Sequence, residues 1–354
     1  MSGAQTLAEW LPDERSAALI TSPLSLRYLC KTPVENGLIL AAKEERFLLV
    51  SEREYPSLAE KVADLKVQPF RGGKQLLELL VKYGIKRIFI EADKMTVSEY
   101  RLFKEQLHYA ELDVSEELSD QLLRMRSVKT DSEIIAVGNA QRICDKAYER
   151  LLGTARKGMT ERQIASLLDF YLVDFGSGPL PFSAMVRSGE NTALPHPKPT
   201  DRPIREGDFL ILEFSASYDG YCARMCRTTA VGEISTRMDN AYNAVSCAIS
   251  DGLRALRAGI GGKVADSVAK ATLNAWNVDQ YCSVNFAHGI GLEPVEPPYL
   301  GQNSSSILKA NTVLSVSCGI SIAGKFGVKI GDMASLTEEG CVDFTAATKS
   351  LLHI

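Results

Sequence analysis

The sequence predicts two domains, an α/β domain followed by a larger α+β domain with a mainly antiparallel sheet. The chain has 354 residues, of which 45% are hydrophobic, and a chain of this length can bury two separate cores. In its first third, short apolar runs alternate with helical patterns, as is typical of α/β structure. In its second half, the apolar pattern mostly has a period of two, which indicates antiparallel strands covered by helices. We place the boundary near Ser127, which gives domains of residues 1–127 and 128–354.

The elements of the first domain follow from periodicity and turn residues. Apolar runs predict strands at residues 17–21, 37–42, 46–51, 67–70 and 87–91. Apolar residues three and four positions apart predict helices at residues 23–30, 54–64, 74–83 and 97–108. The second and third strands are separated only by a short polar stretch, so we expect them to form a hairpin.

The second domain begins with a helix-start signal. A helical stretch at 115–125 leads to Thr130 and Glu133, which have the spacing of a capping box. The expected helices are 131–153, 160–175, 237–257 and 262–276, and the expected strands are 182–187, 209–217, 220–231, 312–318 and 327–337.

Charge and composition exclude several classes of function. Lys and Arg number 40 against 44 Asp and Glu, so the net charge of −4 gives no reason to expect a nucleic-acid partner. Apolar runs such as 209–212 are far shorter than the roughly 20 residues that cross a bilayer. Residues 1–10 contain neither Lys nor Arg and do not resemble a secretory signal. We therefore expect a cytoplasmic protein without a membrane partner.

Three strings in the second domain carry the strongest functional signal. They are ALPHPKPTDR at 193–202, EGDFLILEFSASYDGY at 206–221 running on to Arg227-Thr228, and AHGIGLEPVEPP at 287–298. Together they closely resemble the aminopeptidase P, prolidase, methionine aminopeptidase and creatinase superfamily. This resemblance implies a pita-bread fold for residues 128–354, a creatinase-type α/β domain before it, and a homodimer.

The resemblance also shows where metal ligands would be expected. Peptidases of this superfamily hold two divalent ions, such as Mn, Co or Zn, with two Asp, one His and two Glu. The matching positions in this chain are Glu213, Arg224, His288, Ser317 and Gly331. Asp332 follows the last of these, but neighbouring strand side chains point to opposite faces of a sheet. We therefore expect a degenerate metal site and no metal cofactor.

The remaining residues of these motifs suggest a pocket. We expect Arg224 to fill the metal cavity and to pair with Glu213, because in the family fold the two positions are cross-strand neighbours. In the alternative, Arg224 turns to solvent and the cavity holds water. His196 matches a family His that acts on the transition state or as an acid, so it is the candidate acid–base residue. His288, Glu296 and Ser317 would line the pocket.

Four functions remain open from the sequence. The first is a degenerate Xaa-Pro peptidase that keeps a pocket for a small molecule or peptide, either anionic or proline-containing. The second is a metal-free hydrolase similar to creatinase that uses His196. The third is an active Xaa-Pro peptidase, for which Glu213 and His288 are a thin ligand shell. The fourth is a protein-binding scaffold.

Overall fold

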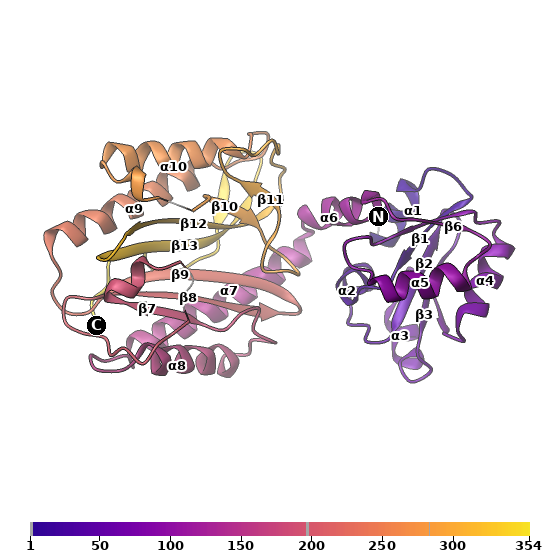
Figure 1. Cartoon of the computed structure of the whole chain (residues 1–354), viewed down its shortest axis with the longest axis horizontal. Helices are drawn as coiled ribbons and strands as arrows, with labels where there is room; N and C mark the ends of the chain where they lie inside the picture. Colours follow the sequence, from indigo (N-terminus) through magenta and orange to yellow (C-terminus); the bar gives the residue numbers. More distant parts are fainter. Residues whose placement is uncertain (1–2, 196–197, 283) are drawn as a thin grey trace. The chain divides into compact units, whose positions relative to one another are not determined.

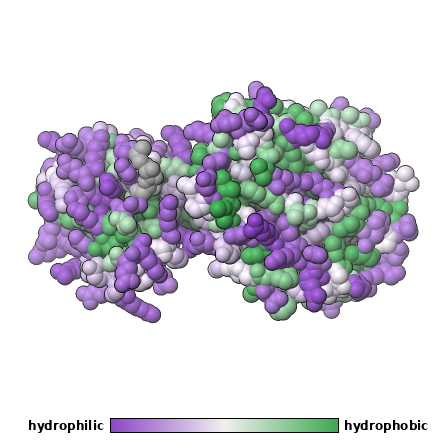
Figure 2. Space-filling view, turned by 180° about the vertical axis from the view of Figure 1, so that it is seen from behind, coloured by the Kyte–Doolittle hydropathy of each residue, from purple (hydrophilic) through white to green (hydrophobic). Residues whose placement is uncertain are grey.

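The chain divides into two compact units after Arg126 (Figure 1). The computed structural model describes residues 3–195, 198–282 and 284–354. In the space-filling view, hydrophilic side chains cover most of the smaller unit, and apolar groups are interspersed on the larger one (Figure 2). Within these described ranges, no helix has the length and apolar character needed to cross a membrane.

The first unit is a six-stranded mixed sheet with helices on both faces. Its strand order is β4-β3-β2-β1-β5-β6, and its central strands β1, β2 and β3 pair antiparallel while the outer pairings are parallel. The strands are β1 Ser16–Ile20, β2 Gly37–Ala42, β3 Arg46–Val50, β4 Lys66–Pro69, β5 Arg87–Ile90 and β6 Glu111–Asp113. The helices are α1 Gly3–Trp10, α2 Pro23–Cys30, α3 Tyr55–Lys61, α4 Gly73–Lys82, α5 Val97–Gln106 and α6 Glu117–Ser127. Apolar residues of β1 pack alternately into the hydrophobic cores on the two faces of the sheet. The whole strand is therefore buried.

The second unit is a curved, mainly antiparallel sheet covered by two helix pairs. The strand order is β11-β10-β12-β13-β9-β8-β7, with β14 paired to β13. The strands are β7 Met185–Ser188, β8 Phe209–Tyr218, β9 Tyr221–Ala230, β10 Ala287–Gly289, β11 Glu296–Leu300, β12 Val313–Ile322, β13 Phe326–Leu336 and β14 Cys341–Asp343. Helices α7 Asp131–Leu152 and α8 Glu161–Asp174 pack on β8, and α9 Thr236–Ala255 packs on β12 and β13, with α10 Lys263–Ala275 beside α9. The predicted fold class is confirmed for both units.

The sequence patterns missed several short elements. Helix α1 and strands β6, β10, β11 and β14 were not predicted, and the strand expected at 182–187 begins only at Met185. The unpredicted strands have three to five residues each, too few to show a period of two. Their partners fix them, because each completes the hydrogen bonds of a longer neighbouring strand.

Strands β9 and β13 meet at a single register position, where Cys226 lies opposite Gly331. The guanidinium of Arg227 lies on the face of the sheet opposite the Cys226 side chain and holds the two strands together at this position. Its Nη1 donates to the carbonyl oxygens of both Cys226 and Gly331 at 2.8 Å, and its Nη2 donates to Asp332 at 2.7 Å. Arg227 and Asp332 are almost completely buried, so the pair acts as a structural clamp.

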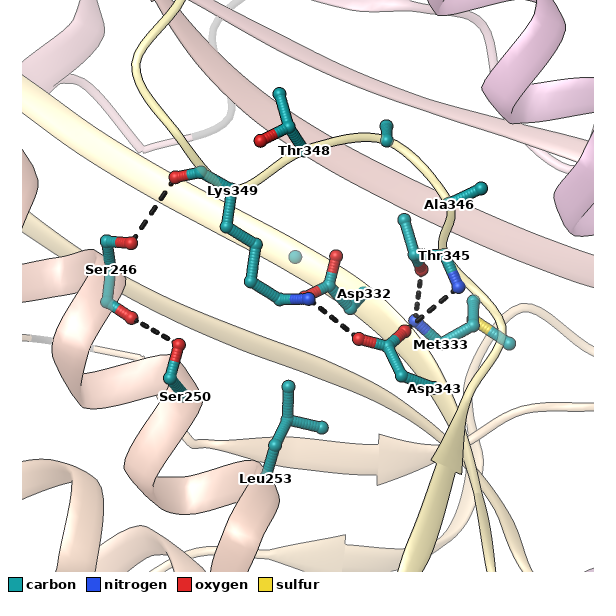
Figure 3. Close-up of polar contacts among 12 residues, drawn as sticks. Ser246, Ser250, Leu253, Asp332, Met333, Asp343, Thr345, Ala346, Thr348 and Lys349 are labelled. Atoms are coloured by element: carbon teal, nitrogen blue, oxygen red, sulfur yellow. Dashed lines mark hydrogen bonds and ion pairs between the residues drawn. The ribbon is translucent and has the colours of Figure 1, made fainter.

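The C-terminal segment packs against the same face and completes this clamp. The ammonium of Lys349 lies 3.1 Å from Asp332 and 2.7 Å from Asp343, and the Lys349 carbonyl accepts a hydrogen bond from Ser246 on α9 (Figure 3). The hydroxyl of Thr345 accepts the backbone N–H of Met333 (Figure 3). The segment therefore ties β13 and β14 to α9.

Candidate functional site

The candidate site lies on the face of the sheet opposite this clamp. A row of directly paired residues crosses five strands there: Met185, Glu213, Cys226, Gly331 and Ser317. Paired residues on neighbouring antiparallel strands have side chains on the same face. Glu213 is the only carboxylate in this row, and its side chain is fully buried.

Three cations surround the Glu213 carboxylate. Arg224 donates to Oε1, the ammonium of Lys329 lies 2.9 Å from the same oxygen, and Arg187 Nη2 donates to Oε2 at 2.9 Å. These three side chains are only 18%, 12% and 6% exposed. We call these four side chains the Glu213 cluster. With one carboxylate and three cations, it carries an excess of positive charge.

The predicted pair between Arg224 and Glu213 is present, but its geometry differs from the expectation. Glu213 lies directly opposite Cys226, while Arg224 lies opposite Ser215, so the pair is diagonal rather than directly cross-strand. A diagonal neighbour on an antiparallel pair lies about 7–8 Å away, a distance that a long guanidinium side chain spans. The Arg224 guanidinium also lies over the ring of Phe182, 5.5 Å from its centroid. The solvent-facing alternative is therefore wrong.

Electrostatics fix the charge of Glu213. Burial alone would raise the pKa of its carboxyl, but the charges of Lys329 and Arg224 and their hydrogen bonds lower it to about 2. The carboxylate therefore stays ionised under all ordinary conditions. Because its two oxygens already receive donors from the three cations, it offers little free acceptor capacity to a further cation.

His288 is held as a neutral imidazole beside the cluster. Its Nδ1 lies 2.9 Å from the carbonyl oxygen of Gly289, and its Nε2 lies 3.3 Å from Nη1 of Arg224. Because a carbonyl only accepts and a guanidinium only donates, these contacts assign the proton to Nδ1 and the lone pair to Nε2. Burial lowers the pKa of His288, and nearby Arg224 and Lys329 act in the same direction.

A glycine makes room for the Lys329 side chain. Gly319 on β12 lies opposite Lys329, and a Cβ there would come within 3.2 Å of the Lys329 Cγ and 2.8 Å of the Val328 carbonyl oxygen. The space left by the missing side chain lets Lys329 extend toward Glu213.

Glu161 anchors the segment that follows β7. Its buried carboxylate accepts hydrogen bonds from the backbone and hydroxyl of Ser188, from Asn191, and from the backbone and hydroxyl of Thr200. Burial would raise the pKa of Glu161, but these hydrogen bonds outweigh burial and lower it. Glu161 thereby fixes β7 and the start of the segment against α8.

A cavity of about 240 Å³ adjoins the cluster and is lined by both Arg187 and Lys329. Its other walls are mostly apolar and come from β8, β12, β13 and residues 192–195. Arg187 Nη1 donates to the Leu194 carbonyl at 3.1 Å, so the segment and the guanidinium fix each other. No Asp or Glu is found among the described residues that line this cavity.

The other predicted site residues have different surroundings. Ser317 lies opposite Gly331, and its backbone N–H donates to the Phe286 carbonyl. Glu296 is buried on β11, where it pairs with Lys129 at 3.4 Å and accepts the backbone N–H of Glu293. His196 lies outside the described residues. Asp332 points to the opposite face from Gly331, as strand alternation requires, and pairs with Arg227.

Two members of the cluster, Arg187 and Lys329, were not predicted. Each is a charged residue with an apolar residue next to it in its strand, in the strings Met185-Val-Arg-Ser188 and Gly327-Val-Lys-Ile-Gly331. A charge at such a position is rarely buried without a partner. That pattern was the available signal, and the partner is the buried Glu213.

Two family models match this chain. Residues 6–128 match the creatinase/prolidase N-terminal domain, and residues 136–338 match metallopeptidase family M24. Because the second match covers more than half of the chain, the chain belongs to metallopeptidase family M24 and has the Xaa-Pro peptidase domain arrangement, with a creatinase N-terminal domain.

Relatives and solved structures agree with this assignment over nearly the whole length. The chain is 30% identical over 336 residues to the uncharacterized peptidase YqhT of Bacillus subtilis, covering 94% of each chain. It is 28% identical over 343 residues to the Xaa-Pro dipeptidase of Pyrococcus furiosus, covering 96% of this chain and 97% of the relative. The structure of an Xaa-Pro dipeptidase from Bacillus anthracis superposes with a TM-score of 0.94 at 30% identity, covering 99% of both chains.

Proposed function

We propose that this chain is a member of the Xaa-Pro peptidase family that works without metal ions, has no metallopeptidase activity, and binds a small anionic ligand or peptide. The observation that carries this proposal is that Arg224, Lys329 and Arg187 all form ion pairs with the Glu213 carboxylate. A dinuclear centre needs several carboxylates to balance two divalent ions. This cluster instead has one carboxylate and three cations.

The donor set does not fit the two metal ions of the family. Neutral His288 directs its lone pair at the Arg224 guanidinium, and Glu213 accepts from three cations. In the described ranges, no group of three or more His, Cys, Asp or Glu side chains is arranged to hold a metal ion. A divalent ion entering here would meet fixed positive charges at close range and would be repelled.

The same charge favours anions. A desolvated cluster of two guanidinium groups and one ammonium attracts carboxylates, and guanidinium groups bind them through directed, charge-assisted hydrogen bonds. A peptide with a free C-terminal carboxylate, including a proline-containing dipeptide, meets this requirement. The Xaa-Pro dipeptidase relatives make dipeptides a natural first class of ligand to examine.

The test measures metal content and peptidase activity together. Elemental analysis of the purified protein should find well below one transition-metal ion per chain, and added Mn²⁺, Co²⁺ or Zn²⁺ should produce no Xaa-Pro cleavage. The Xaa-Pro dipeptidase of Pyrococcus furiosus, purified and assayed in parallel, serves as the control. One or two bound ions per chain, together with cleavage that chelation abolishes, would overturn the proposal.

A further inference from the structure

The cavity beside the Glu213 cluster combines two buried cations with apolar walls. Arg187 and Lys329 line it, together with Leu194, Pro195, Ile211, Val284, Ile320 and Val328. Cations at one wall and aliphatic groups on the others are typical of a site for an organic anion rather than for an inorganic ion or a free sugar.

Arg187 has hydrogen-bonding capacity that the protein does not use. Its Nη1 donates to Leu194 and its Nη2 to Glu213, but its Nε is buried and has no partner among the residues that the structure describes. A buried donor without an acceptor has lost its hydrogen bond to water and gained none in return, which is unfavourable. A side chain that is only 6% exposed and lines a cavity would recover this cost by donating to a ligand oxygen.

Lys329 supplies the second donor. Its ammonium has three N–H groups, and the contact with Glu213 Oε1 uses one of them. Because Arg187 and Lys329 hold the two oxygens of the same carboxylate, their charged ends lie close together. A ligand carboxylate can therefore contact both cations at once.

We infer that this cavity binds a small organic carboxylate with an aliphatic body, the head group held by Arg187 Nε–H and the Lys329 ammonium. This rests on the proposed function, since it requires that the cluster holds cations of the protein instead of metal ions. At roughly 30 Å³ for each water-sized group, 240 Å³ accommodates a body and head of about eight non-hydrogen atoms. Aliphatic oxo acids, short branched acids and the acyl end of a small peptide have this size.

The experiment compares isosteric ligands by isothermal titration calorimetry on the full chain. The probes are 4-methylpentanoate, its neutral amide 4-methylpentanamide, and acetate. We expect the branched carboxylate to bind at least about tenfold more tightly than the amide, because only the carboxylate satisfies both cations. It should also bind at least about tenfold more tightly than acetate, which has the head group but not the aliphatic body. Equal affinity for the carboxylate and the amide, or no binding of either, overturns the inference.

Two variants locate the site. Leu194→Ala alters a half-exposed wall residue, so it should leave folding intact and weaken 4-methylpentanoate several-fold without affecting acetate. Leu102→Ala, at an equally exposed leucine of the first unit, is the matched control and should change neither affinity. Lys329→Met should abolish the preference for carboxylate over amide. If both Leu variants behave alike, the ligand binds elsewhere and the inference is wrong.

Failure of this inference can be told apart from failure of the proposed function. Bound metal in the elemental analysis would contradict the proposed function whatever the calorimetry gives. A metal-free protein that does not distinguish the carboxylate from the amide would leave the proposed function standing and overturn only the ligand class.

Discussion

Lys329 and Glu213 form an ion pair across an intervening strand. Glu213 is on β8 and Lys329 is on β13, and β9 lies between them in the sheet. The pair is possible because Cys226, directly beside Glu213 on β9, is small, and because Gly319 leaves space along the Lys329 chain. Strands from both halves of the sheet therefore contribute charge to one carboxylate.

In the Glu213 cluster, we expect loss of the carboxylate to lower the free energy of unfolding more than loss of one of the cations. Glu213→Gln leaves three largely buried cations without their counter-charge, so we expect it to lower the free energy of unfolding by about 3–5 kcal/mol. Arg224→Met leaves Glu213 with Lys329 and Arg187, so we expect a smaller loss of about 1.5–3 kcal/mol. Urea titrations measure both values.

The control for this pair of variants is an exposed ion pair. Arg162 and Asp201 are 63% and 78% exposed, so Arg162→Met should have little effect on the free energy of unfolding. If Arg224→Met destabilises the protein more than Glu213→Gln does, the carboxylate is not the shared partner that the structure indicates.

The clamp behind the site gives a second prediction. Arg227→Met removes the donors to Cys226 and Gly331 and leaves Asp332 with Lys349 as its remaining cation, so it should destabilise the protein by about 3–5 kcal/mol. Arg227→Lys keeps the charge but cannot reproduce the fork of donors, so it should recover only part of this loss. Arg254→Met, at a 74% exposed arginine that pairs with Asp251, is the control and should have little effect. Thermal unfolding measures the stability of all three variants. Full recovery by Lys would show that charge alone matters at this position.

Glu161 predicts a dependence of stability on pH. Because its pKa is lower in the folded protein than its usual value of 4.5, its ionised form stabilises the fold above that value. The contribution is lost as the pH falls through the lowered pKa. Urea midpoints of the wild type and Glu161→Gln should therefore differ most near about pH 7 and converge toward about pH 3. A difference that stays constant over this range would mean that the charge of Glu161 contributes nothing.

Two glycines test the packing beside Lys329. In Gly319→Ala the new methyl group would meet the Val328 carbonyl and the Lys329 chain, so we expect a loss of about 1–3 kcal/mol. In Gly138→Ala, within α7, nothing lies within 4 Å of the new methyl group. This control should stabilise the protein by about 0.5–1 kcal/mol through helix propensity. Similar effects of both substitutions in urea titrations would argue against a tight contact at Gly319.

The long helices and strands could be predicted because the spacing of their apolar residues follows which side chains are buried. Helix α7 begins at the capping box of Thr130 and Glu133, both of whose hydrogen bonds are present. Strand β8 is buried at every residue except the last, and its apolar run at 209–212 is typical of a strand covered on both faces. Short strands such as β10, with three residues, depend on pairing with distant segments and have no pattern of their own.

The site was only partly predictable for a related reason. Glu213, Arg224 and His288 were found through motif positions, and the structure brings these three together. Arg187 and Lys329 lie 26 and 116 residues from Glu213 in sequence, so their meeting depends on strand order and register. No local sequence pattern indicates that β13 is separated from β8 by β9 alone. This arrangement follows from the strand order of the folded sheet.

The central claim is that cations of the protein, not metal ions, hold Glu213. The most direct measurement is a crystal structure of protein soaked in Mn²⁺ or Zn²⁺, with anomalous scattering recorded at the metal edge. The account predicts the Arg224 guanidinium and the Lys329 ammonium against the Glu213 carboxylate, and no anomalous peak beside Glu213 or His288. An anomalous peak at a ligand distance of about 2.0–2.2 Å from Glu213 and His288, with Arg224 displaced, would contradict it.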